Sequence, residues 1–148
     1  MDRIEQCITL PAPIDRVWRA ISDHREFGTW FKVALDQPFA AGQPSTGHMT
    51  NEGYEHLRWN ASVEAVEPPH RLAFRWHPYA IEPGRDYSSE PTTLVEFLLE
   101  PAGGGTRLRV IESGFDALPD SRRDEAFRMN SGGWAKQVEN IRDYLAAS

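Results

Sequence analysis

Residues 121–147 read SRRDEAFRMNSGGWAKQVENIRDYLAA, and this stretch decides the fold of the chain. Its large apolar side chains recur at helical spacing and form one stripe. The stripe consists of Phe127, Trp134, Val138, Ile141 and Leu145. Charged side chains occupy the opposite face, so the pattern predicts one amphipathic helix over residues 121–147, with Ser121 and Asp124 as a weak capping box. No other segment predicts a helix of this length, and we expect this one to cover the strands before it.

The apolar stripe is interrupted between Phe127 and Trp134, where residues 130–133 read NSGG. Each glycine inside a helix costs about 1 kcal/mol relative to alanine. One interpretation is that a first helix ends at Met129 and a second begins at Trp134. The other is that the small residues leave room for a bound molecule between the helix and a sheet. The spacing alone does not separate the two.

The rest of the chain predicts strands with two short helices near its beginning. Alternating apolar and polar residues predict strands over residues 3–10, 47–51, 56–67, 71–77, 94–100 and 106–113, and a short strand over 33–35. Short helices are expected over residues 14–22 and, capped by Asp23, over residues 24–30, where Gly28 weakens the pattern. The sequence PAGGG at 101–105 predicts a hairpin turn.

This order of elements predicts the fold class. A run of strands followed by a long helix is typical of an α+β domain. We expect a curved antiparallel sheet of about six or seven strands wrapped around the C-terminal helix, in a single domain over residues 1–148. A curved sheet and one helix do not fill all the space between them, which predicts a cavity there.

Composition and charge exclude several classes of function. The formal net charge is −6, which argues against nucleic acid as the main partner, because phosphate binding needs a basic face. No apolar run approaches the roughly 18 residues of a membrane span, and the first residues lack the pattern of a signal peptide. Cys7 is the single cysteine and can form no intrachain disulfide. These features predict a cytoplasmic protein.

Several short motifs follow one another along the chain. They are PIDRVWRAISD at 13–23, WF at 30–31, VEAVEPP at 63–69, RLAFRW at 71–76, EPAGGGTRL at 100–108, SGF at 113–115 and GGW at 132–134. In this order they resemble the activator of heat-shock-protein-90 ATPase-like family of the START-like, or SRPBCC, superfamily. The resemblance covers nearly the whole chain and implies the helix-grip fold.

For function, the resemblance implies several alternatives. Relatives bind sterols, lipids, polyketides and plant hormones in the cavity, while others are cyclases, hydrolases or co-chaperone domains. The family has no shared catalytic motif that could be placed on this sequence, and the fold does not choose among these functions. The site must therefore be predicted from the residues themselves.

The predicted cavity wall combines inward-facing strand residues with residues of the long helix. It consists of Phe31, Trp59, Phe74, Trp76, Val95, Phe97, Leu99, Leu108, Val110, Met129, Gly133 and Trp134. Alternation alone is equally typical of side chains that simply fill the core. The family resemblance favours a lined cavity over a filled one.

Glu112 is the candidate catalytic residue, because it continues the inward phase of Leu108 and Val110. An inward carboxylate is costly unless it is paired or reaches water. It could accept a hydrogen bond from a ligand, or act as a general acid or base together with His56 or Tyr87. The alternative is that the strand ends there and leaves the carboxylate solvated at the rim.

The leading hypothesis is therefore the binding of a small, largely apolar molecule between the sheet and the C-terminal helix. A cyclase- or hydrolase-type enzyme that uses Glu112, and a co-chaperone-like module with a protein partner, remain alternatives. The histidines show no metal-ligand spacing and no nucleotide-binding motif is present, so neither a metal nor a cofactor is expected.

Two further expectations concern the surface. The loop over residues 78–91 is long and rich in Pro, Gly, Ser and Asp, so we expect it to be mobile and to serve as a lid. Arg122, Arg123 and Arg128 near the start of the long helix, and Arg75 and His77 in the strand over residues 71–77, are expected to be solvated.

Overall fold

A computed structural model describes residues 2–82 and 84–147, and it contains every helix and strand expected above. In chain order the elements are β1 (Arg3–Leu10), α1 (Ile14–Ser22), α2 (His24–Phe31), β2 (Val33–Leu35), β3 (Pro44–Met49), β4 (Arg58–Glu67), β5 (Arg71–Trp76), β6 (Thr93–Ala102), β7 (Gly105–Ser113), a 3-10 turn η1 (Phe115–Ala117) and α3 (Asp120–Ala147). The main differences are boundaries. Strand β3 begins at Pro44, earlier than expected, and α3 begins at Asp120.

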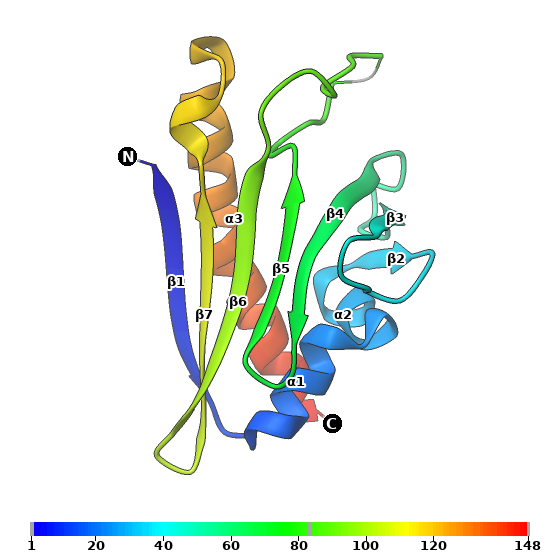
Figure 1. Ribbon diagram of the computed structural model, residues 1–148. Coiled ribbons are helices and arrows are strands. Elements are labelled where there is room, and N and C mark those ends of the chain that lie inside the picture. The colour runs from blue at the N-terminus through cyan, green and yellow to red at the C-terminus, as the bar shows by residue number, and fades with distance from the viewer. Residues whose placement is uncertain (1, 83, 148) are drawn as a thin grey trace.

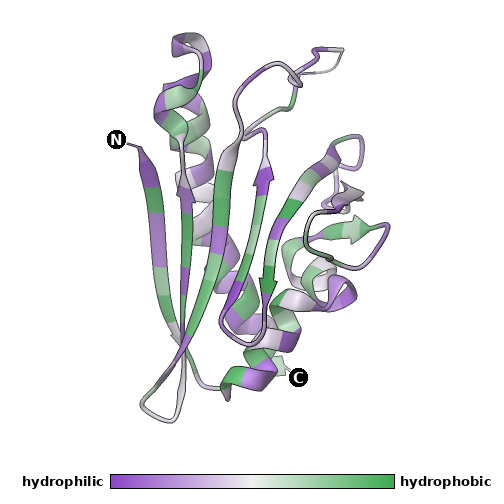
Figure 2. Ribbon diagram, in the orientation of Figure 1, coloured by the Kyte–Doolittle hydropathy of each residue, from purple (hydrophilic) through white to green (hydrophobic). Residues whose placement is uncertain are grey.

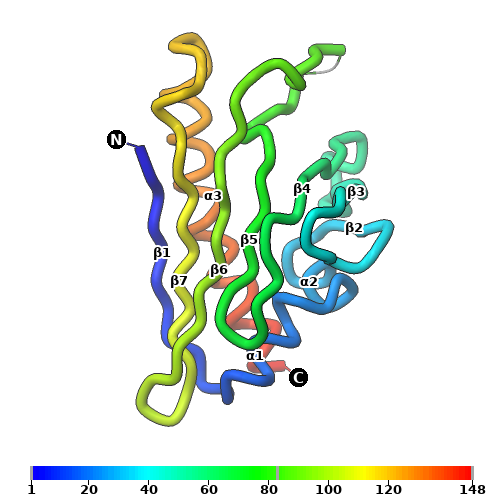
Figure 3. Tube along the Cα trace, viewed as in Figure 1, coloured from blue at the N-terminus to red at the C-terminus, as the bar shows by residue number. Residues whose placement is uncertain are grey.

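The sheet has seven antiparallel strands in the order β1-β7-β6-β5-β4-β3-β2. It curves around α3, which passes behind it in Figure 1, while α1 and α2 lie at the lower end of the sheet. Strand β1 pairs with β7 along its whole length, from Arg3 opposite Ser113 to Leu10 opposite Thr106. Figure 3 shows these two strands side by side, although most of the chain separates them. The predicted α+β helix-grip fold is confirmed.

The two faces of the sheet differ in polarity, as the alternating colours along the strands in Figure 2 show. Inward-facing residues such as Phe74, Phe97 and Leu108 are fully or almost fully buried and pack towards α3 and the short helices. Outward-facing residues form ion pairs between neighbouring strands, among them Glu5 with Arg109, Glu96 with Arg71 and Glu64 with Arg75. Pairs that reach solvent, as these do in part, contribute little stability, so the inner face holds the fold together.

Helix α2 shows how local sequence sets local structure. The Asp23 carboxylate caps it by accepting hydrogen bonds from the backbone N–H groups of Arg25 and Glu26, at 2.9 and 3.0 Å. Gly28 lies where the helix meets β2, and a Cβ atom there would stand 2.3 Å from the Val33 carbonyl oxygen. The glycine that weakens the helical pattern is thus needed for this close approach.

Helix α3 is a single unbroken helix of 28 residues, so the interpretation as two helices is wrong. Its apolar stripe faces the core: Trp134 is 3% exposed, and Val138, Ile141 and Leu145 are also buried. At Gly132 and Gly133 an added Cβ atom would meet no other side chain or neighbouring element within 4 Å. Close packing therefore does not require these two glycines, and open space lies beside them.

The C-terminal half of α3 is tied to the two short helices by Glu26. The Tyr144 hydroxyl donates to the Glu26 carboxylate at 2.7 Å, and Arg16 and Arg19 donate to the same group at 2.9 Å. Burial of the Glu26 carboxyl acts to raise its pKa, but the bonds from Tyr144 and Arg16 outweigh this effect and hold the pKa below its usual range. This link therefore stabilises the fold at neutral pH and is lost as the pH falls through that lowered pKa.

Candidate functional site

A buried carboxylate organises the centre of the molecule. Glu112 in β7 is 0% exposed and accepts four hydrogen bonds. Its Oε2 atom accepts from Trp76 Nε1 at 2.7 Å and from Thr93 Oγ1 at 2.5 Å. Its Oε1 atom accepts from Trp134 Nε1 at 2.8 Å and from Asn130 Nδ2 at 3.0 Å. We call these five residues the Glu112 cluster.

The local structure explains how these side chains meet. Trp76 is the last residue of β5 and lies opposite Thr93, the first residue of β6. Glu112 lies near the end of β7, on the inner face that Leu108 and Val110 also occupy. Asn130 and Trp134 are four residues apart on α3 and so share one face of the helix. Polar side chains from β5, β6, β7 and α3 therefore meet at one point.

The hydrogen bonds define what the carboxylate can do. Indole and amide N–H groups only donate, and a carboxylate offers about four acceptor positions. All four positions on Glu112 are occupied, and its partners are uncharged. The interpretation of Glu112 as a solvated residue at the rim is wrong, because the side chain is fully buried. In this arrangement it holds Trp76, Trp134 and Asn130 in fixed orientations.

An open apolar groove of about 250 Å³ lies beside the cluster, between α3 and the sheet. It is lined by Phe31, Met49, Leu57, Trp59, Trp76, Tyr79, Ile81, Asn130, Gly133, Trp134 and Gln137. Four of its aromatic rings form a row in which each ring contacts the next. The ring centroids are 6.0 Å apart for Phe31 and Trp134, 5.8 Å for Trp134 and Trp76, and 5.2 Å for Trp76 and Trp59. We call this feature the apolar groove.

Five residues of the predicted cavity wall line this groove, namely Phe31, Trp59, Trp76, Gly133 and Trp134. Glu112 is not part of the lining, but it accepts hydrogen bonds from the indoles of Trp76 and Trp134. The other predicted strand residues are buried in the core away from the groove lining, namely Phe74, Val95, Phe97, Leu99, Leu108 and Val110. Met129 is 41% exposed and does not line the groove, because its neighbour Asn130 occupies the position on α3 that faces the sheet.

Six lining residues were not predicted from the sequence: Met49, Leu57, Tyr79, Ile81, Asn130 and Gln137. Helical spacing could have identified two of them. Asn130, Trp134 and Gln137 are separated by four and three residues, so they lie on one face of α3. The other four come from loops and from a strand end, where no periodicity indicates which way a side chain faces.

Arg122 of α3 anchors the loop between β5 and β6. Its guanidinium donates to the carbonyl oxygens of Pro78 and Tyr79 at 3.0 Å each, and pairs with Glu90 at 2.8 Å. It also lies 4.7 Å from the centre of the Tyr87 ring. The expectation that Arg122 is solvated is wrong, since it is only 7% exposed. The anchor holds Tyr79, whose φ of 51° is unusual for a residue other than glycine, at the edge of the groove.

We expect Arg122→Lys to loosen this loop without unfolding the protein. Lysine keeps the charge but cannot bond Glu90 and two carbonyl oxygens in the same planar geometry, which should lower the local opening free energy by about 1–2 kcal/mol. Amide hydrogen exchange should then quicken over residues 78–91 and stay unchanged in β6. Arg123→Lys is the matched control, because the ion pairs of Arg123 with described residues are those with Asp120 and Asp124 near the surface. Equal exchange in both variants would show that Arg122 does not hold the loop.

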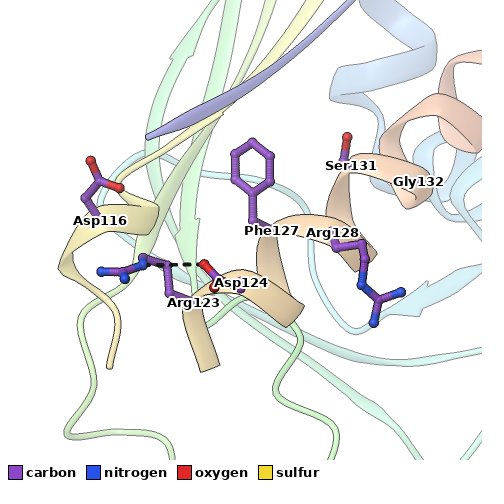
Figure 4. Close-up of a pocket in the computed structure, with 7 residues that line it drawn as sticks. All are labelled: Asp116, Arg123, Asp124, Phe127, Arg128, Ser131 and Gly132. Carbon is purple, nitrogen blue, oxygen red and sulfur yellow. Dashed lines mark ion pairs between the residues drawn. The ribbon is translucent and has the colours of Figure 1, made fainter. Parts of the chain in front are cut away.

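A second, larger concavity of about 740 Å³ lies against another part of α3, near η1 (Figure 4). It is lined by Asp116, Arg123, Asp124, Phe127, Arg128, Ser131 and Gly132. Most of these side chains are charged or small, and Arg123 forms an ion pair with Asp124. Phe127 is its one large apolar ring and is already packed against Phe115, with the ring centres 5.1 Å apart. This concavity is therefore less suited to an apolar molecule than the apolar groove.

Within residues 2–82 and 84–147, no three His, Cys, Asp or Glu side chains come together as a group that could hold a metal ion. None of the helices in the same ranges combines the length and the hydrophobicity that crossing a bilayer requires.

The curved sheet, the long helix and the groove between them define a START-like, or SRPBCC, helix-grip protein. Residues 11–146 match the family described as "Activator of Hsp90 ATPase homolog 1-like protein", and the chain belongs to this family. The resemblance found in the sequence is therefore confirmed. No curated protein matches the chain.

Solved structures agree with this assignment. The crystal structure of DynU16, a protein in the dynemicin biosynthetic locus, is similar with a TM-score of 0.76 and 26% identity, covering 99% of this chain and 48% of DynU16. The chain thus spans about half the length of DynU16. Protein MLL2253 from Mesorhizobium loti has a TM-score of 0.77 and 25% identity, covering 99% of this chain and 98% of its own. CalU16 from Micromonospora echinospora, at 20% identity and a TM-score of 0.67 over 96% of this chain and 74% of its own, shares the fold.

Proposed function

We propose that this protein binds a small, largely apolar molecule in the apolar groove between α3 and the sheet. One observation carries the proposal. Five aromatic residues line an open groove where α3 presents Gly133 instead of a side chain, namely Phe31, Trp59, Trp76, Tyr79 and Trp134. Large aromatic rings gain most from contact with another apolar surface, so a groove of this kind favours an aromatic or alicyclic ligand.

The size of the groove limits the ligand. A cavity of about 150 Å³ can hold benzene, and drug-sized ligands occupy pockets of about 300–1,000 Å³. The groove measures about 250 Å³, which suits a molecule of roughly one to two fused rings, with part of a larger ligand extending into solvent.

The lining favours binding over acid–base catalysis. Among the described residues, no carboxylate, histidine, lysine, arginine or cysteine lines the groove. Glu112 has all its acceptor positions filled by protein donors, His56 is exposed, and Tyr87 is stacked with Arg85 and Arg122 away from the groove lining. A cyclase or hydrolase that used Glu112 would first have to break the cluster, which binding does not require.

Two neighbouring glycines provide a matched test of the proposal. Gly133 lines the apolar groove, whereas Gly132 lines the concavity near η1, and both have open space beside them. Leucine has a much better helix propensity than glycine, so Gly132→Leu and Gly133→Leu should each raise the free energy of unfolding by up to about 1 kcal/mol. Only Gly133→Leu places a large side chain in the groove.

The measurement is the affinity for N-phenyl-1-naphthylamine, an uncharged fluorescent probe, together with the urea midpoint of each variant. We expect Gly133→Leu to weaken probe binding at least tenfold and Gly132→Leu to leave it unchanged. If both variants bind the probe as the original chain does, or if Gly132→Leu alone weakens binding, the groove is not the binding site. A wild-type protein that does not bind the probe at all would count against an apolar ligand site.

A further inference from the structure

Most polar groups that line the apolar groove are already bonded within the protein. The indole N–H groups of Trp76 and Trp134 donate to Glu112, and that of Trp59 donates to Ser45 Oγ at 3.0 Å. Gln137 is committed at both ends of its amide, since Nε2 donates to the Phe31 carbonyl and Oε1 accepts from Asn140. The aromatic wall therefore offers its ring faces to a ligand but no free indole donor.

Asn130 differs from these residues because only one end of its amide is bonded. The two ends of an asparagine amide are usually hard to tell apart, and the hydrogen-bond network decides between them. Here the decision is clear, because the Glu112 carboxylate only accepts, so the NH₂ end must face Glu112 Oε1, 3.0 Å away. The carbonyl oxygen, Oδ1, receives no hydrogen bond from any described residue, although the side chain is half-buried in the groove lining.

From this geometry we infer that Asn130 Oδ1 is a hydrogen-bond acceptor for the ligand, and that the groove selects aromatic molecules carrying a hydroxyl or N–H donor. The inference rests on the proposed ligand-binding function and adds a chemical class to it. A ligand with a donor restores a hydrogen bond to a partly desolvated oxygen, whereas a ligand without one covers that oxygen and leaves it unpaired. Glu112 is the positioning residue of this contact, since its Oε1 atom accepts from the NH₂ end of the Asn130 amide and leaves the carbonyl end for the ligand.

The hydroxyl of Tyr79, another lining residue, likewise has no hydrogen-bond partner among the described residues. A phenol both donates and accepts, so it can pair with an ether as readily as with a hydroxyl. Tyr79 therefore cannot discriminate between the two kinds of ligand, and Asn130 can. This difference makes Tyr79→Phe the matched control for Asn130→Leu.

The test compares 1-naphthol with 1-methoxynaphthalene, which share one ring system but differ in the hydroxyl donor. In a groove with apolar contacts alone, the ether would bind more tightly because it is the more apolar molecule. We expect the wild-type protein to reverse this order and bind 1-naphthol about tenfold more tightly, as one additional hydrogen bond allows. Isothermal titration calorimetry gives both dissociation constants.

In Asn130→Leu the preference should disappear through weaker binding of 1-naphthol, while binding of the ether is retained or improved. In Tyr79→Phe the preference should remain. If the wild-type protein binds both compounds, Gly133→Leu weakens both, and the ether binds as tightly as the naphthol or more so, the groove is a binding site but the role of Asn130 is overturned. If neither compound binds, the proposed function itself fails. Because the wild-type preference is measured without any substitution, the inference stays testable even if Asn130→Leu does not fold.

Discussion

Glu112→Ala is expected to destabilise the fold by about 4 kcal/mol or more, which would place it among the most damaging single substitutions in this chain. The change removes the acceptor of four buried or half-buried donors, from Trp76, Thr93, Asn130 and Trp134. Each donor left unpaired costs roughly 1–3 kcal/mol, and the lost side-chain volume adds a cavity. The free energy of unfolding from urea denaturation, followed by far-UV circular dichroism, measures the effect.

Two control variants separate the hydrogen bonds of Glu112 from its volume and from the general effect of losing a glutamate. Glu112→Gln keeps the volume but replaces one acceptor oxygen with an NH₂ donor, which would face the donors of the cluster, so an intermediate loss of about 2 kcal/mol is expected. Glu96→Ala removes a glutamate from the outer face of neighbouring β6, where it pairs with Arg71, and should cost less than about 1 kcal/mol. A Glu112→Ala protein as stable as the Glu96→Ala protein would mean that the carboxylate does not organise the core.

Trp134→Ala should cost about 3–5 kcal/mol, the usual range for truncation of a large buried aromatic residue. The indole is 3% exposed, contacts the rings of Phe31, Trp76 and Phe97, and donates to Glu112. Trp134→Phe keeps a ring but loses the indole N–H, so it should cost only about 1–2 kcal/mol. A urea midpoint for Trp134→Ala close to that of the original chain would contradict the central position of this residue.

The regular elements could be predicted because their periodicity is visible within a few neighbouring residues. The alternation of Val95, Phe97 and Leu99 in β6, and the stripe from Trp134 to Leu145 in α3, correctly indicated which side chains are buried. The inward phase of Glu112 could also be read from the sequence. The burial of Glu112 could not be predicted from the sequence. A buried carboxylate needs hydrogen-bond donors, and the four donors here come from β5, β6 and α3, whose contact with one another no local pattern reveals.

Arg122 illustrates the same limit. A run of charged residues at the start of a helix is usually solvated, and Arg128 is indeed exposed. Arg122 is buried because the loop between β5 and β6 folds over it and supplies two carbonyl oxygens and Glu90. Likewise, hydrophobicity favours Met129 for the wall, but the helical phase differs by one residue and places Asn130 in the groove lining, while Met129 is 41% exposed.

The pairing of β1 with β7 has a consequence for the synthesis of the protein. When β1 leaves the ribosome, its only partner strand in the sheet has not yet been made, because β7 begins at Gly105. At roughly 5–20 residues per second, the wait is on the order of ten seconds. During this time Ile4 and Leu10, which are buried in the finished protein, have no sheet to cover them. Within this sheet, the first strand to be translated is therefore one of the last to be paired, and pairing across such a separation is intrinsically slow.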